Sequence, residues 1–403
     1  MDATTAPGIL IARRTRAVVA RLAIAQALTG ANSAVIFATG SIIGSMLAPS
    51  QSLATLPLSI FVLGMAAGTL PVGVVARLYG RRATFVAGTA SGAVCGVLAM
   101  IAILRGSFAL FCVATFLGGL YGSVAQSYRF AAADGATPEF RAKALSWVMA
   151  GGVFAGVLGP QLVQWTMDLW QPYLFAASFA AQVVVAFLAM ALLATVDAPK
   201  PVAADFAGGR PLLEIVSKPR FISAVICGVV SYFLMNFVMT SAPLAMKLCG
   251  LSVSDSNFGI QWHIVAMFGP SFFTGAVIAR LGAPTVVAIG LLLEATAAAI
   301  GLSGITALHF WSALIVLGLG WNFGFVGASA LVLEAHRPSE KNKVQAFNDF
   351  LVFGTMAVGS FSSGQLLTDY GWTMVNLVVF PPIAIGLCAL LIDVVARRRA
   401  AAA

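Results

Sequence analysis

Four side chains with soft donor atoms recur at helical spacing in two successive apolar segments. Met235 and Met239 are four residues apart in the first segment, and His263 and Met267 are four residues apart in the second. Residues at this spacing lie on one face of a helix, one turn apart. Thioether sulfur and imidazole nitrogen together suit Cu(I), whereas zinc prefers thiolate, imidazole and carboxylate, and magnesium and calcium prefer oxygen. The spacing therefore predicts a copper site made by these four residues, whose neutral ligands would also let the metal leave.

The same residues have a purely structural interpretation. Methionine is a common gap-filler in apolar helices, so the Met235 and Met239 pair alone indicates nothing about metal. Two consecutive antiparallel helices, rising about 1.5 Å per residue, would nevertheless present both pairs at similar depths. The residues alone leave open a copper site on the one hand, and a packing methionine pair with a hydrogen-bonded histidine on the other.

The amino-acid composition indicates the kind of protein that carries these four residues. Of 403 residues, 60% are hydrophobic and only 9% are charged, against about a quarter charged in soluble domains. So few charges cannot cover the surface of soluble domains, which excludes a soluble enzyme. We expect no enzymatic activity, no catalytic residues and no permanently bound cofactor. The net charge of +9 is spread along the chain rather than gathered on one face, so we expect a lipid bilayer and no nucleic acid as partner.

Apolar stretches long enough to cross a bilayer core, about 20 helical residues, recur along the chain and predict an all-α integral membrane fold of twelve transmembrane helices. The predicted spans are 18–47, 52–76, 83–104, 107–130, 143–166, 172–196, 219–244, 255–280, 283–305, 308–332, 344–368 and 372–396. All of the 23 lysines and arginines except Arg105 and Lys247 then fall on one side. The positive-inside rule makes that side the cytoplasm. We expect a multi-pass protein of the bacterial inner membrane with both termini cytoplasmic.

The chain divides into two similar halves. A polar stretch rich in proline and glycine, residues 197–218, predicts a cytoplasmic linker between a six-helix bundle of residues 1–196 and another of residues 219–403. Residues 75–78 match 278–281, and residues 138–143 match 338–343, both at an offset near 200. A shared offset indicates duplication, and pseudo-symmetric paired bundles are a transporter architecture.

The loop after the second span resembles that of the major facilitator superfamily, as does the whole chain. The family pattern is a glycine, an Asp-Arg pair, a second glycine and two basic residues. The glycines and the final basic pair are present as Gly73, Gly80, Arg81 and Arg82, but Arg77 and Leu78 replace the Asp-Arg pair. The resemblance implies that the four matching residues form a gating loop. The alternative is a basic loop that only sets topology.

The paired methionine and histidine motifs also resemble those of the CcoA-type copper importers of this superfamily. The resemblance implies that Met235, Met239, His263 and Met267 carry copper into the cytoplasm by alternating access, for assembly of a haem–copper cytochrome oxidase. It implies a copper ion and a downstream copper chaperone or exporter as partners, and we expect a monomer.

Two cysteines extend this hypothesis. Cys227 and Cys249 resemble the family's cysteine pair associated with copper handling, which implies a relay. Twenty-two residues of helix would separate them by about 33 Å, far beyond a disulfide, unless the helix breaks near Pro243. A buried, apolar Cys227 and an incidental Cys249 are the alternative.

Few other polar side chains lie at membrane depth, where each is a candidate for function. Glu294 is a candidate for proton coupling, or else a packing carboxylate hydrogen-bonded to a serine or threonine. Asn236, Trp321 and Asn322 are candidates for cavity lining, with close helix packing as the alternative for the last two. Buried arginines of the kind that anion carriers need are missing from this set.

Two other functions stay open. The first is an organic-solute carrier, riboflavin-like or drug-like, in which aromatic side chains stack on a ring, since nearby members of the wider superfamily resemble riboflavin transporters. The second is a non-transporting assembly factor that binds copper and passes it to a partner.

Overall fold

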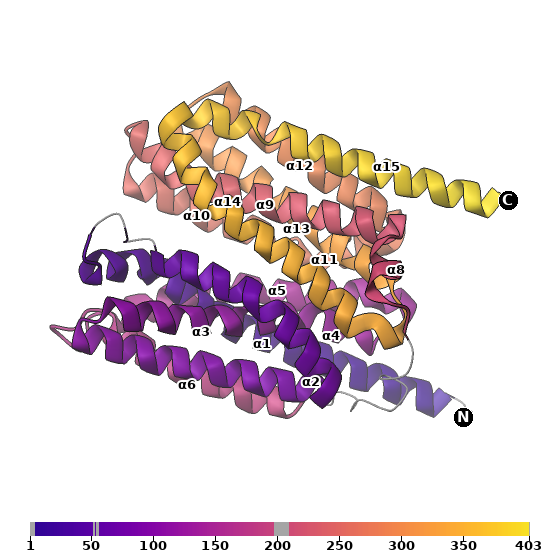
Figure 1. The fold of residues 1–403 in the computed structure, drawn as a ribbon, viewed down its shortest axis with the longest axis horizontal. Helices are drawn as coiled ribbons and strands as arrows, with labels where there is room; N and C mark the ends of the chain where they lie inside the picture. Colours follow the sequence, from indigo (N-terminus) through magenta and orange to yellow (C-terminus); the bar gives the residue numbers. More distant parts are fainter. Residues whose placement is uncertain (1–4, 51–52, 54–55, 197–208, 403) are drawn as a thin grey trace. The chain divides into compact units, whose positions relative to one another are not determined.

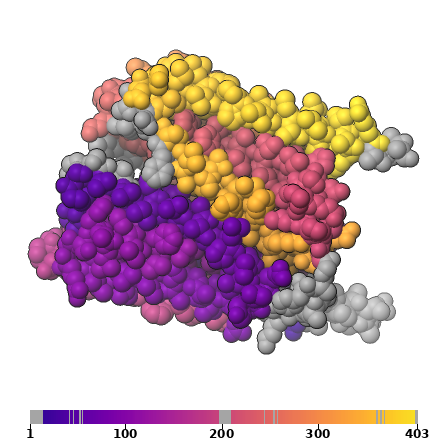
Figure 2. Space-filling model, viewed as in Figure 1, coloured from indigo at the N-terminus to yellow at the C-terminus, as the bar shows by residue number. Residues whose placement is uncertain are grey.

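The computed structural model describes residues 5–50, 53, 56–196 and 209–402. Within these residues the regular structure is entirely helical (Figure 1). The chain divides into two compact units, Met1–Ala207 and Gly208–Ala403. The division falls inside the predicted linker, whose residues 197–208 lie outside the described part of the chain. Figure 2 shows the two units as separately coloured masses, indigo to magenta and red to yellow.

The first unit consists of α1 (Thr5–Leu47), α2 (Leu56–Arg105), α3 (Phe108–Gln126), α4 (Tyr128–Asp134), α5 (Pro138–Thr166) and α6 (Ala176–Ala194). Helix α1 packs mainly on α5, and α2 packs on α3 and α6. Local sequence sets two of these boundaries. The Ser107 hydroxyl accepts a hydrogen bond from Leu110 N at the start of α3, and proline occupies the first turn of α5, where its missing N–H costs nothing.

The second unit consists of α8 (Leu212–Val216), α9 (Pro219–Leu248), α10 (Val253–Phe268), α11 (Ser271–Leu281), α12 (Ala283–Ser303), α13 (Ala307–Ala335), α14 (Lys341–Leu377) and α15 (Phe380–Ala402). Helix α9 packs on α13, α14 and α15, whereas α10 packs mainly on α13, and α13 also packs closely on α12. These contacts make α9 and α13 the centre of the unit.

Among the described residues, nine helices are long and apolar enough to cross a membrane, and the bent pair formed by α10 and α11 makes a tenth. One of the nine, α2, contains two predicted spans, because Gly80 interrupts it with a positive φ of 86°. Gly371 interrupts α14 in the same way with a φ of 78°, and Gly282 precedes α12 with a φ of 80°. Only glycine adopts this conformation without strain. Each of these glycines lies between two consecutive predicted spans.

One predicted span is not a continuous helix. The predicted span 255–280 is a bent pair of helices, because the segment breaks after Phe268 and resumes at Ser271 with a bend of 43°. Pro270 has no N–H to donate to the carbonyl one turn earlier, and its ring crowds the preceding turn. Part of the predicted linker also differs from expectation, since residues 212–216 form the short helix α8.

Glycines bring α12 and α13 into backbone contact. A Cβ placed on Gly290 would lie 2.2 Å from Gly324 N, so the two helices could not approach this closely with any other residue there. A Cβ on Gly320 would likewise lie 2.9 Å from Glu294 Cγ. The contact therefore presses the side chain of Glu294, one turn beyond Gly290, directly against α13.

A network of charged groups links the segment before α8 to the turn between α13 and α14. We call this network, formed by Arg210, Arg337, Glu340 and Lys343, the clasp. Arg210 donates to Glu340 through its backbone N at 3.0 Å and through Nε and Nη2, each at 2.8 Å. Arg337 N donates to the same carboxylate at 2.9 Å, and Lys343 Nζ donates to Arg210 O. The hydrogen bonds from Arg210 lower the pKa of Glu340 to about 2 and raise that of Arg210. The clasp holds the residues before α8 to the turn between α13 and α14.

Candidate functional site

His263 is completely buried on α10 and is oriented by α13. Its Nδ1 lies 2.7 Å from Leu314 O. A carbonyl oxygen can only accept, so Nδ1 carries the proton and Nε2 holds the lone pair of the neutral ring. Nε2 is buried with no hydrogen-bond partner in the described part of the chain. The orientation leaves an imidazole nitrogen available as a ligand.

The two predicted ligand pairs have different packing environments. Met267 is buried one turn beyond His263, and Met235 is buried on α9, where Met239 is only partly covered. Helix α10 packs mainly on α13, whereas α9 packs more on α13, α14 and α15 than on α10. Asn236, next to Met235, donates to Met356 O of α14 at 3.5 Å. The four-residue copper site therefore stays a prediction.

The cysteines lie at opposite ends of α9. Helix α9 runs unbroken through Pro243 to Leu248, with Cys249 capping its end and Cys227 fully buried near its start. The thiol of Cys227 lies 3.5 Å from Gly386 O of α15. Both thiols are free, as are the other three cysteines. A continuous helix keeps Cys227 and Cys249 too far apart to bond in this structure.

Glu294 is a fully buried carboxylate at the centre of the second unit. Ser231 on α9 donates to its Oε1 at 2.6 Å. Its Oε2 is buried and has no hydrogen-bond partner among the described residues. The hydrogen bond is the packing interaction expected for a carboxylate at this depth, but it satisfies only one of the two oxygens. The second oxygen leaves room for a proton, which would neutralise the group in an apolar environment.

Asn322 bonds to both sides of the break between α10 and α11. The residue is completely buried, and its Nδ2 lies 2.6 Å from both Met267 O and Ser271 Oγ. Thr274 Oγ1 donates to Asn322 Oδ1 at 2.6 Å. Sequence reasoning identified Asn322 as a polar residue of interest, but its partners appear only when α13 packs against the break at Pro270.

Trp321 lies in an aromatic cluster contributed by four helices. Its ring stacks on Phe325 with centroids 5.2 Å apart and an interplanar angle of 19°, and Phe268 approaches edge-on at 5.4 Å. Tyr232 of α9 contacts Trp321 at 5.4 Å and Phe353 of α14 at 5.2 Å. Trp321 is 1% exposed, and its Nε1 has no acceptor in the described part of the chain. The cluster offers flat apolar faces and one unused N–H.

The predicted gating loop joins α2 to α4 within the first unit. Arg81 is 8% exposed, and its Nη2 lies 2.9 Å from Asp134 Oδ2 at the end of α4. Gly73 and Gly80 are buried, whereas Arg82 and Arg77 are exposed. The loop is therefore fixed at Arg81 through an ion pair that the sequence pattern did not identify, because Asp134 is 53 residues away.

The expectation that buried arginines are missing is wrong for the first unit. Arg129, one of the basic residues counted on the cytoplasmic side, is 1% exposed. Its Nη1 donates to Gln126 O at 2.6 Å, and its guanidinium carbon lies 4.4 Å from the centre of the Phe130 ring. The ring contact and the helix break at Ser127 turn the side chain inward.

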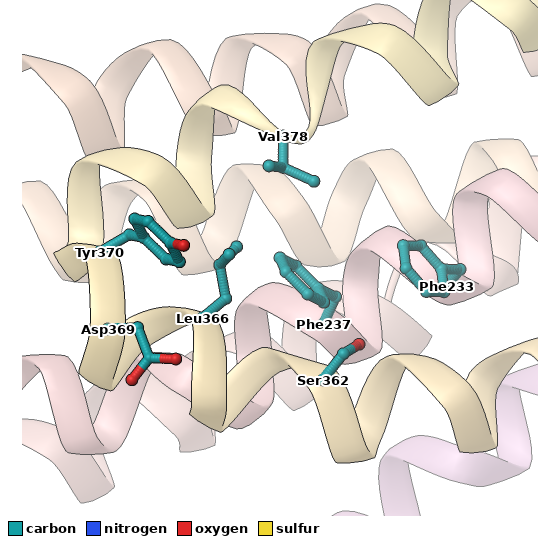
Figure 3. A pocket seen from close by; sticks show the side chains of 7 residues that line it. All are labelled: Phe233, Phe237, Ser362, Leu366, Asp369, Tyr370 and Val378. Atoms are coloured by element: carbon teal, nitrogen blue, oxygen red, sulfur yellow. The ribbon is translucent and has the colours of Figure 1, made fainter.

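A crevice of about 380 Å³ opens on the second unit between α9 and the end of α14 (Figure 3). Its walls are mostly apolar. The lining residues are Phe233, Phe237, Ser362, Leu366, Asp369, Tyr370 and Val378. None of the predicted site residues borders this crevice. Asn236, Trp321 and Asn322 are buried in this structure, so their role in lining a cavity stays a prediction.

Sequence comparison places the chain in a family. The sequence model of the Major Facilitator Superfamily matches residues 22–354. The chain belongs to this superfamily. It is a multi-pass membrane protein and a secondary transporter, as the apolar spans and the two similar halves predicted.

Three known proteins show how specific the similarity is. The riboflavin transporter RfnT of Brucella anthropi is 48% identical over 374 residues, which cover 92% of this chain and 94% of RfnT. The proton:xylose symporter XylE has a TM-score of 0.75 at 15% identity, covering 94% of this chain and 95% of XylE. The human organic anion transporter MFSD10 has a TM-score of 0.74 at 15% identity, covering 93% and 99%. The two structures support the fold, whereas the RfnT match favours the organic-solute alternative over copper import.

Proposed function

We propose that this transporter carries riboflavin, or a flavin of the same ring system, across the bacterial inner membrane by alternating access, with both termini in the cytoplasm. The observation that carries the proposal is the 48% identity to a riboflavin transporter over 92% of the chain. A match of that extent includes most of both units. The proposal replaces copper as the leading substrate.

The aromatic cluster of the second unit supports a flat aromatic substrate. Tyr232, Trp321 and Phe325 provide ring faces within 5.4 Å of one another. The unused Nε1–H of Trp321 is a donor of the kind that a flavin ring carbonyl accepts, since a buried donor gains most from finding a partner. We assign this cluster as the ring-recognition element, which separates when the transporter admits its substrate.

Glu294 is proposed as the group that couples transport to a proton gradient. It is the buried carboxylate with one free oxygen, and it contacts the same α9 and α13 that carry the aromatic cluster. Protonation would let Glu294 stay neutral at this depth, and deprotonation would strengthen the hydrogen bond that it accepts from Ser231. Substrate release and proton release would then be linked through α9.

Uptake measured in cells tests the proposal. A riboflavin auxotroph lacking its own transporter, when it expresses the wild-type chain, is expected to grow on micromolar riboflavin and to accumulate the labelled vitamin. Cells that express a Trp321→Leu variant at equal membrane abundance should accumulate much less. Wild-type expression with no growth and no accumulation would refute riboflavin transport.

Copper import is kept as a second candidate because of one observation. His263, one turn before Met267, has an Nε2 with no hydrogen-bond partner among the described residues, which is the start of a soft-metal site. Copper accumulation in the same cells tests it, with His263→Leu and Met235→Leu as variants. Copper binding by the purified protein without cellular accumulation would favour the assembly-factor alternative. Equal accumulation by wild type and both variants would remove Met235, Met239, His263 and Met267 as the copper site.

A further inference from the structure

The crevice beside α14 is built as an amphiphile-binding site. Phe233 and Phe237, one turn apart on α9, stack with centroids 5.5 Å apart at 18° and form its floor. A Cβ on Gly359 would lie 2.8 Å from the Phe233 ring, so the glycine allows the ring to lie flat against α14. The deep part is therefore a smooth apolar surface. Figure 3 shows the Leu366 and Phe237 side chains close together within it.

Polar groups collect at one end of the crevice only. Asp369 and Tyr370 lie within α14, directly before its interruption at Gly371, and Figure 3 shows both at the same end of the crevice. Tyr370 is 66% exposed, and Asp369 is exposed and forms no ion pair in the described part of the chain. The hydroxyl of Ser362 is already bonded to Val358 O of its own helix at 2.9 Å. The crevice thus has an apolar interior and a mouth with an uncompensated negative charge.

The crevice lies beside the face of α14 that packs on α9. Met356 O and Ser363 O accept hydrogen bonds from α9, which marks the packed face. Ser362, Leu366 and Asp369 follow one another at spacings of four and three residues and so form a neighbouring stripe. Val358, on the same side of α14, is 64% exposed although it is apolar. An exposed apolar side chain beside the crevice suits contact with an acyl chain.

We propose that this crevice binds one phospholipid with a cationic ammonium headgroup. One acyl chain lies over Phe233 and Phe237, and the ammonium group pairs with Asp369 while Tyr370 contributes its phenol. A volume of about 380 Å³ lies within the range of small-molecule sites. An ammonium lipid satisfies the carboxylate, whereas an anionic lipid places like charges together. The site is separate from the aromatic cluster and does not depend on the transported substrate.

Native mass spectrometry of the purified full-length protein tests this proposal. The wild type is incubated with phosphatidylethanolamine or phosphatidylglycerol of identical acyl chains. We expect one phosphatidylethanolamine to be retained preferentially. Asp369→Asn should weaken its retention about fivefold, the effect of one charge pair near a surface, and should abolish the preference. Asp168→Asn is the matched control, because Asp168 is an exposed carboxylate of the first unit bonded only to Gln171 among the described residues.

A second variant tests the apolar part of the site. Leu366→Trp fills the crevice without touching Asp369 and should weaken retention of both lipids. A single peak on gel filtration and an unchanged thermal midpoint establish that each variant is folded. If Leu366→Trp does not fold, the comparison of Asp369→Asn with Asp168→Asn tests the proposal alone. The proposal would be overturned if the wild type retained the two lipids equally. It would also be overturned if Asp369→Asn preferred phosphatidylethanolamine as strongly as the wild type does. Displacement of the bound lipid by riboflavin would overturn it too, because the crevice would then belong to the transported solute.

Discussion

Ser231 Oγ donates a 2.6 Å hydrogen bond to Glu294 Oε1, and this bond joins α9 to α12 at the centre of the second unit. Because Oε2 is buried and unpartnered among the described residues, Glu294 can take up a proton without losing this bond. We predict that Glu294→Gln, which mimics the protonated form, retains riboflavin binding but loses the stimulation of uptake by an inward proton gradient. Uptake into proteoliposomes, with and without the gradient, measures this directly.

Ser231→Ala is the companion variant for that experiment. It removes the hydrogen bond but keeps the carboxylate, so gradient-driven uptake should persist, with a shifted dependence on pH. Gradient stimulation of Glu294→Gln equal to that of the wild type would show that the coupling proton binds elsewhere.

The indole N–H of Trp321 is predicted to contribute to substrate affinity. Trp321→Phe keeps an aromatic face in the cluster but removes the donor, so the KM for riboflavin should rise about fivefold, as for loss of one hydrogen bond of about 1 kcal/mol. Trp372→Phe is the matched control. Its Nε1 already donates to Gly301 O at 3.1 Å, so this change should lower thermal stability while KM stays constant. A KM unchanged in Trp321→Phe contradicts the assignment of the cluster.

Asn322 is predicted to stabilise the bend between α10 and α11. Asn322→Ala removes three hydrogen bonds and leaves Met267 O and the Thr274 hydroxyl to find other partners. The expected loss is on the order of 1–3 kcal/mol, visible as a lower thermal midpoint in detergent. Thr296→Ala should have no such effect, since Thr296 is exposed and bonds only to Leu292 O of its own helix. Equal midpoints for both variants would mean that the bend is maintained by Pro270 alone.

The Arg210 and Glu340 clasp predicts how stability depends on pH. The pKa of Glu340 is lowered in the folded protein to about 2 from a model-peptide value near 4.5. Its contribution to stability is therefore complete above about pH 4.5 and is lost as the pH falls toward 2. Thermal unfolding followed across this range should show the loss in the wild type, whereas Glu340→Gln should be less stable at neutral pH and less sensitive to acid.

Glu214 provides the control for the clasp. Its carboxylate lies 4.0 Å from the same Arg210 but is half exposed, so Glu214→Gln should change stability little. If both variants behaved alike, the effect would come from the charge of Arg210 and not from the buried geometry around Glu340.

The sequence was sufficient for features that depend on local chain properties. Hydropathy located the spans, and Gly80, Gly282 and Gly371 fall between predicted helices because a positive φ is a local requirement of a sharp turn. The prediction that Glu294 bonds to a serine or threonine follows from burial alone, and Ser231 is that residue.

Features that depend on packing between distant segments could not be predicted. Arg129 was counted among the basic residues of the cytoplasmic side, because hydropathy does not indicate that its guanidinium folds back over Phe130. Asn322 looked like a cavity residue, because its three partners belong to a break 48 to 55 residues away. The copper prediction rested on spacing within two helices, and spacing alone says nothing of how α9 and α10 face each other.

The free thiols and the continuity of α9 give this protein a built-in set of topological markers. Cys249 caps one end of α9 and is partly exposed, whereas Cys227 is enclosed near the other end. A membrane-impermeant maleimide added to intact cells, with the labelled residue identified by peptide mapping, should modify Cys249 only if the termini are cytoplasmic, whereas the buried Cys227 stays unlabelled in either orientation. The orientation of the whole chain can therefore be determined on the native sequence, without introducing a single engineered cysteine.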